Sequence, residues 1–102
     1  MFLSLQLAAP RVTIVPNRVR VKVGDLVVFA CFASGSPKPQ VEWIRINGSL
    51  PVNHTIQQGV LKIPYVKRYD SGSYSCRATN TEGTAEATSK LEIKGTSLKY
   101  KL

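Results

Sequence analysis

Apolar residues recur at every second position through much of this chain, and this period of two constrains the fold more than any other feature. From Arg18 to Val23, valine alternates with arginine or lysine, which is typical of a β-strand with one buried and one solvent-facing side. Further predicted strands, each followed by turn residues, cover 26–32, 41–46, 60–63, 73–80 and 84–93. No stretch predicts a helix of more than one turn, so the chain is predicted to be all-β.

The length of 102 residues accommodates one domain, because a second hydrophobic core would need roughly 50 residues more. About seven short strands with frequent turns predict a β-sandwich of two sheets. We expect residues 9–94 to form this domain, residues 1–8 to be a leader or expression scar outside the fold, and residues 95–102 to be a basic tail or linker. No apolar run reaches the roughly 18–20 residues of a membrane-spanning helix, so no membrane insertion is expected.

The two cysteines lie in the middle of two predicted strands, and Trp43 lies in the strand that follows the first of them. A disulfide between Cys31 and Cys76 would join the two sheets, with the indole of Trp43 packed against the sulfurs. Such a bridge would close a long loop, for which the chain-entropy model gives about 4 kcal/mol of stabilisation. Two buried thiols in an intracellular sandwich are the alternative.

A specific motif surrounds the second cysteine. Asp70-Ser71-Gly72-Ser73-Tyr74-Ser75-Cys76 reads D-x-G-x-Y-x-C, and Ala78, Asn80 and Gly83 extend it. With Gly24-Asp25 before the first cysteine and Gly35-x-Pro37-x-Pro39-x-x-x-Trp43 after it, the chain resembles immunoglobulin domains of the I-set. The stretch from Trp43 to Val66 is also similar to the immunoglobulin repeats of the basement-membrane heparan sulfate proteoglycan perlecan and of related matrix and adhesion proteins. The resemblance implies a Greek-key immunoglobulin sandwich.

Four residues in and near this motif are predicted to be structural: Trp43, Asp70, Gly72 and Tyr74. Tyr74 shares the inward parity of Cys76, so its ring belongs to the core and its hydroxyl needs a hydrogen-bond partner there. Backbone carbonyls in the bend before the strand can supply this partner. Gly72 permits the bend, and the carboxylate of Asp70 can cap it. This arrangement is a tyrosine corner.

No pattern of side chains indicates catalysis. General acid–base or nucleophilic chemistry needs a base beside a nucleophile or a second acid. The one histidine, His54, lies in a polar loop without a carboxylate or cysteine nearby, and the 6 acidic residues are scattered. Neither a glycine-rich phosphate loop nor the Cys/His spacing of a zinc site occurs. We therefore expect a protein that is not an enzyme and has no catalytic residue, metal or cofactor.

Two N-x-[S/T] sequons, at Asn47 and Asn53, follow the tryptophan strand. Both lie in a predicted loop, where an oligosaccharide would meet solvent, and Thr55 favours the second as the acceptor. Used sequons imply a secreted or cell-surface glycoprotein, and that oxidising compartment in turn favours the disulfide.

Strand parity also predicts an apolar stripe on the outside of one sheet. If Cys31 points inward, so do Val27 and Phe29, and alternation turns Leu26, Val28, Ala30 and Phe32 outward. Val60 points outward from a neighbouring strand, so the predicted stripe consists of Val28, Ala30, Phe32 and Val60. Such a stripe is either shielded, by a covering side chain or by the N-terminal segment 1–7, or in contact with another domain or molecule.

The chain carries 14 Lys and Arg against 6 Asp and Glu, a net charge of +8, which favours an acidic partner. Arg18, Arg20 and Lys22 repeat along one strand at a spacing of about 6–7 Å, and Lys67-Arg68 lie at the corner. Aromatic residues for stacking on nucleic acid are few, so we expect no nucleic acid and regard sulfated glycosaminoglycan as the natural polyanion. The alternative is a solvated strand whose charges prevent edge-to-edge pairing.

Two classes of function therefore stay open. The first is a structural or adhesive module of a matrix or cell-surface protein, which contacts extracellular proteins and neighbouring domains of a longer chain. The second is a module that binds heparin or heparan sulfate through the basic strand. A third interpretation is an intracellular muscle-type immunoglobulin repeat, in which the sequons are accidental and the cysteines are free.

Overall fold

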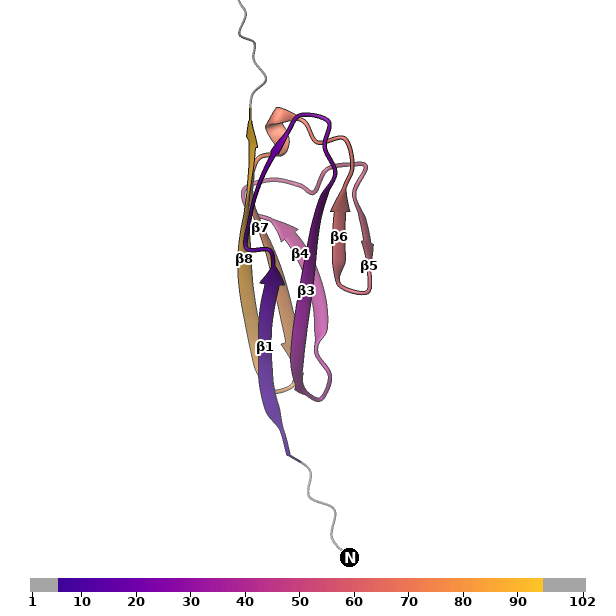
Figure 1. Cartoon of the computed structure of the whole chain (residues 1–102). Helices are drawn as coiled ribbons and strands as arrows, with labels where there is room; N and C mark the ends of the chain where they lie inside the picture. The colour runs from indigo at the N-terminus through magenta and orange to yellow at the C-terminus, as the bar shows by residue number, and fades with distance from the viewer. Residues whose placement is uncertain (1–5, 95–102) are drawn as a thin grey trace, which may run out of the picture.

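The computed structural model describes residues 6–94, which form two facing four-stranded β-sheets (Figure 1). The strand orders are β1-β3-β6-β5 and β2-β8-β7-β4. The elements are β1 (Ala8–Val15), β2 (Arg18–Lys22), β3 (Val27–Ser36), β4 (Gln40–Arg45), β5 (Thr55–Gln57), β6 (Val60–Ile63), the one-turn 3-10 helix η1 (Arg68–Asp70), β7 (Gly72–Asn80) and β8 (Gly83–Lys94). The predicted all-β immunoglobulin sandwich is confirmed.

The N-terminal part of the chain contributes one strand to each sheet. β1 pairs antiparallel with β3, and the chain then crosses to the other sheet, where β2 runs parallel to β8. Sequence alternation predicted β2 but not β1 or the three-residue β5. Prolines at positions 10 and 16 obscure the pattern of β1, and all three side chains of β5 are exposed, so that neither segment shows a clear period of two.

The first strand begins one residue earlier than the domain boundary that we expected. Ala8 pairs with Ser36, and its carbonyl accepts a hydrogen bond of 2.9 Å from the side-chain amide of Asn80. Ala8 is therefore part of the sheet and not of a leader. The remainder of the expected leader lies largely in residues 1–5, and the expected tail is 95–102; both segments are outside the described residues.

The core lies between the sheets, around a disulfide that joins Cys31 of β3 to Cys76 of β7 with their Cα atoms 6.4 Å apart. Phe29 is fully buried, and its ring centroid lies 6.1 Å from that of Trp43 and 6.0 Å from that of Tyr74. The other buried apolar residues are Ile14, Val27, Leu61, Ile63, Val66, Ala78 and Leu91. Both sheets thus contribute the inward side chains of their alternating strands.

The corner before β7 is held by side-chain to backbone hydrogen bonds. The hydroxyl of Tyr74 donates to the carbonyl of Asp70 at 2.5 Å, and the carboxylate of Asp70 accepts from the backbone N–H of Lys67 at 2.8 Å. Burial raises the pKa of Tyr74 to about 12, so the hydroxyl stays protonated and remains a donor. Gly72 has a φ of +141°, which a side chain would disfavour.

Arg45 is a structural residue that the sequence did not reveal. Its guanidinium lies 5.5 Å from the centroid of the Tyr74 ring and donates to the backbone carbonyls of Tyr69 and Ser71. It thereby connects the end of β4 to both sides of the corner. No local sequence pattern predicts this role, because the carbonyls that Arg45 binds lie more than 20 positions further along the chain.

Candidate binding surfaces

The outward side of β2 and β8 carries a concentration of charge, which we call the basic face. Parallel pairing brings three charged residues of each strand into direct register: Arg18 beside Lys90, Arg20 beside Glu92 and Lys22 beside Lys94. Sequence alternation indicated the three residues of β2 but not Lys90 and Lys94. The only local signal for them is the outward parity of positions 90, 92 and 94 in β8, which says nothing about the neighbouring strand.

Glu92 is the acidic member of the basic face and pairs with both arginines. Its carboxylate accepts a hydrogen bond of 3.2 Å from Nε of Arg20, and Nη2 of Arg18 lies 3.7 Å from its second oxygen. The hydrogen bond from Arg20 holds the pKa of Glu92 below its ordinary value, and the charge of Arg18 acts in the same direction. The side chains of Arg18 and Arg20 are still 64% exposed, so both guanidinium groups can reach a further anion.

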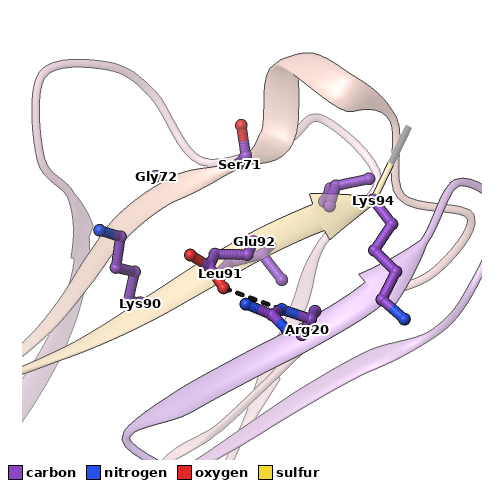
Figure 2. Close-up of a pocket in the computed structure, with 8 residues that line it drawn as sticks. Arg20, Ser71, Gly72, Lys90, Leu91, Glu92 and Lys94 are labelled. Atoms are coloured by element: carbon purple, nitrogen blue, oxygen red, sulfur yellow. Dashed lines mark hydrogen bonds and ion pairs between the residues drawn. The ribbon is translucent and has the colours of Figure 1, made fainter.

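A hollow of about 500 Å³ adjoins the basic face where β7 begins (Figure 2). Its polar lining consists of Arg20, Ser71, Lys90, Glu92 and Lys94. Figure 2 shows Lys90 and Lys94 at two ends of the β8 segment, with Glu92 between them and the guanidinium of Arg20 reaching it from β2. The hollow therefore holds three cationic side chains around one carboxylate.

Lys67 and Arg68 lie at the same end of the sandwich as Lys22, but the structure does not bring Lys67 into the basic face. The backbone of Val66 bonds to the turn after β2, donating to Asp25 and accepting from Gly24. Lys67 instead lines a second hollow of about 210 Å³ with Arg45 and the loop 49–53. Arg68 is exposed in η1 and lines neither hollow. Lys67 therefore does not extend the row of basic residues on β2, contrary to the expectation from the sequence.

The outward side of the other sheet carries an apolar surface, which we call the apolar face. It consists of the four residues of the predicted stripe, together with Val15 of β1 and Leu26 just before β3: Val15, Leu26, Val28, Ala30, Phe32 and Val60. Phe32 is 60% exposed, Leu26 57% and Val15 53%. The N-terminal segment that was expected as one cover lies mostly outside the described residues, and Leu7 within them is itself exposed.

Both sequon asparagines are exposed, but their amides differ. Asn47 lies in the turn after β4 with a φ of 63°, and no hydrogen bond of its side chain occurs within residues 6–94. The side-chain nitrogen of Asn53, which an oligosaccharide would modify, donates to the carbonyl of Pro64 at 2.7 Å. The fold therefore leaves the amide of Asn47 freer than that of Asn53, although Thr55 had favoured Asn53.

Within residues 6–94, the side chains that could act in catalysis or metal binding are otherwise dispersed. His54 is half-buried, and its Nδ1 lies 2.6 Å from the carbonyl of Pro51. In the described part of the chain, no three side chains of His, Cys, Asp or Glu gather closely enough to hold a metal ion. Within the same residues, no helix has the length and apolar character to span a membrane.

Comparison with known proteins gives consistent matches. The model of the immunoglobulin I-set domain matches residues 10–93. The basement membrane-specific heparan sulfate proteoglycan core protein of mouse is 36% identical over 91 residues, which are 89% of this chain and 2% of that protein. Human neural cell adhesion molecule L1-like protein is 38% identical over 72 residues, which are 68% of this chain and 6% of that protein.

A relative named for smooth muscle and a solved structure match as well. Smooth-muscle myosin light chain kinase of chicken is 36% identical over 104 residues, which are 94% of this chain and 5% of that protein. A chimeric titin Z1Z2 structure superposes with a TM-score of 0.73 at 36% identity, covering 87% of this chain and 97% of that one. The chain thus spans only a small part of the curated relatives that it matches.

Proposed function

The chain belongs to the immunoglobulin I-set family, and from this premise we propose that it is a non-catalytic module of a longer extracellular protein that makes structural and adhesive contacts with other proteins. Relatives that are named for the basement membrane and for cell adhesion support this proposal. So do the two exposed sequons and the disulfide, which fit an oxidising compartment. An intracellular muscle-type repeat would use neither. We propose Ala8–Lys94 as the module, and Asn47 and Asn53 as its acceptors for N-linked glycans.

The apolar face is the observation that carries the adhesive proposal. The outer side of an antiparallel sheet is ordinarily polar, because it meets water. Here Val15 of β1 pairs with Ala30 of β3, which lies between the outward residues Val28 and Phe32. The side chains of Val15, Val28 and Phe32 are all exposed. Contiguous exposed apolar side chains of this kind mark protein interaction sites. Arg11 and Lys62 lie on the same side of the sheet, so the contact would suit a partner with acidic residues around an apolar centre.

A photo-crosslinking residue in place of Phe32 tests this use of the apolar face. Benzoylphenylalanine at position 32 should form one or a few discrete adducts when the protein is irradiated in a basement-membrane extract. The matched control places it at Thr88, which is exposed on the opposite sheet. Mass spectrometry of the adducts then identifies the partner. The same adducts at both positions, or no adduct at position 32, would contradict an adhesive apolar face.

The basic face supports sulfated-glycan binding as a second candidate function. The specific observation is the register of β2 and β8, which adds Lys90 and Lys94 to the three basic residues that the sequence had indicated. Within each strand, alternate residues are about 6–7 Å apart, so the three cations of β2 form a row beside Lys90 and Lys94 of β8, which flank Glu92. Binding of this kind depends mainly on charge and weakens as the ionic strength rises.

Replacing Arg18, Arg20 and Lys22 together by serine should lower the salt concentration at which the domain elutes from heparin. The unfolding temperature should hardly change, because exposed ion pairs contribute only about 0–1 kcal/mol. A control variant with serine at Arg11, Lys38 and Lys62 loses the same charge from other exposed positions. If both variants elute at the same salt concentration, or the wild type elutes at or below physiological salt, the basic face is only a solvated surface.

A further inference from the structure

The pairing of charges across β2 and β8 is unfavourable for stability. Arg18 is in register with Lys90, and Lys22 with Lys94. Glu92 is the one acidic residue among these six positions, and it pairs with both Arg20 and Arg18. Like charges that are directly opposite in a sheet destabilise it. A strand that needed only to be solvated would gain from an acid at position 90 or 94. The arrangement therefore indicates a surface that is completed by an anion from outside.

Glu92 occupies the position on this face where such an anion would find the most positive charge. Its carboxylate contacts Arg20 and Arg18, and the side chains of Lys90 and Lys94 lie on either side of it in β8 (Figure 2). The adjoining hollow is open to solvent and large enough, at about 500 Å³, for a sulfated sugar residue. An incoming anion would therefore compete with Glu92 for the guanidinium of Arg20.

We propose that this hollow binds a sulfate group of a linear sulfated glycan, and that Glu92 is a built-in competitor that lowers the affinity. The proposal rests on the glycan-binding function proposed above. It adds the site that binds the sulfate and the residue that limits the affinity. A sulfate offers several acceptor oxygens, which suits the fork of Arg20 and the flanking lysines. The three cations along β2 and the two lysines of β8 favour a polymer with repeated sulfates over an isolated anion.

The variant Glu92→Gln tests the role of the carboxylate. A unit charge about 6 Å from the ligand in water corresponds to about a threefold change in affinity without salt and about a twofold change at 0.1 M salt. Glu92→Gln should therefore bind heparin about two- to threefold more tightly at 0.1 M salt. It should also elute at a higher salt concentration than the wild type. Calorimetric titration with size-defined heparin and heparin chromatography measure the two effects. Glu92→Thr, which also removes the charge and suits a strand, serves as a second variant.

Glu86→Gln is the matched control. Glu86 lies on the same outward side of β8 and pairs with Arg77 at 2.6 Å, so its replacement causes the same change in net charge. It is six residues away along the strand, roughly 20 Å, which is about two Debye lengths at 0.1 M salt. We expect Glu86→Gln to bind heparin like the wild type. An equal gain in both variants would overturn the inference, because the effect would then come from net charge alone.

Further experiments test which anionic group is bound and whether the two lysines of the hollow contribute to binding. Lys90→Ser and Lys94→Ser should each weaken heparin binding, whereas Lys62→Ser on the other sheet should not. Hyaluronan, which carries carboxylates but no sulfates, should bind Glu92→Gln much more weakly than heparin does. Equal binding of hyaluronan, or of vesicles that contain phosphatidylserine, would overturn the assignment to sulfate.

The outcomes separate this inference from the function on which it rests. If the wild type binds heparin and loses it in the Arg18, Arg20 and Lys22 variant, but Glu92→Gln gains nothing, glycan binding stands and the competitor role is wrong. If only Glu92→Gln binds, the competitor role is supported, while the wild type is not a glycan-binding module. If neither protein binds, both proposals fail.

Discussion

Replacing Phe29 by alanine is expected to lower the free energy of unfolding by about 3–5 kcal/mol, whereas the same replacement at Phe32 should lower it by less than about 1 kcal/mol. The two phenylalanines lie on the same strand but on opposite sides of it. Phe29 is fully buried between Trp43 and Tyr74, while Phe32 is 60% exposed. Truncation at position 29 therefore leaves a cavity in the aromatic centre of the core, and truncation at position 32 mainly removes surface.

Urea unfolding followed by the fluorescence of Trp43 measures both variants against the wild type. The urea midpoint of Phe29→Ala should lie far below that of the wild type, and the midpoint of Phe32→Ala close to it. The dependence of the unfolding free energy on urea should be similar in all three proteins. Phe29→Leu provides a milder core variant if Phe29→Ala does not fold. A loss at position 32 as large as that at position 29 would mean that Phe32 is covered within the chain. The apolar face would then be unavailable to a partner.

Removal of the disulfide should have an effect of similar size. The double replacement Cys31→Ala and Cys76→Ala is expected to cost about 4 kcal/mol, within the range of about 2–5 kcal/mol for native disulfides. The bridge spans a sequence separation of 45 and joins the two sheets, so its loss both frees the unfolded chain and loosens the packing beside Trp43. The measurement is thermal unfolding of the variant and of the wild type with and without reductant.

The wild type with reductant should unfold at nearly the same temperature as the double variant. Intact-mass measurement after alkylation under non-reducing denaturation provides the chemical check. Two alkylated cysteines in the wild type would contradict the disulfide and favour the intracellular muscle-type interpretation. No alkylation together with a large shift on reduction would support the extracellular proposal.

The two candidate surfaces lie on the outer sides of opposite sheets, so they can be tested independently (Figure 1). Changes to Phe32 should leave heparin retention unaltered, because position 32 belongs to the sheet β1-β3-β6-β5. Changes to Arg20 should leave crosslinking through position 32 unaltered for the same reason. A module with both functions would hold a protein on one side and a sulfated chain on the other.

The sequence by itself determined the features that depend on neighbouring residues. The side of a strand on which a residue lies follows from its position in an alternation, so Phe29 could be assigned to the core and Phe32 to the surface without any tertiary information. The D-x-G-x-Y-x-C motif likewise indicated the corner, because Tyr74 and the carbonyl that it binds are only four residues apart.

The tertiary structure alone decided which distant segments became neighbours. Arg20 and Glu92 are 72 positions apart, and only the parallel register of β2 with β8 places them in contact between two like-charged pairs. The contact of Arg45 with the corner was likewise not predictable, because Arg45 binds backbone carbonyls and no residue type in the sequence marks them. Lys67 turned toward a different hollow because the corner folds against the loop after β4. Alternation specifies the face of each strand but not its partner, and the partner depends on how the whole core packs.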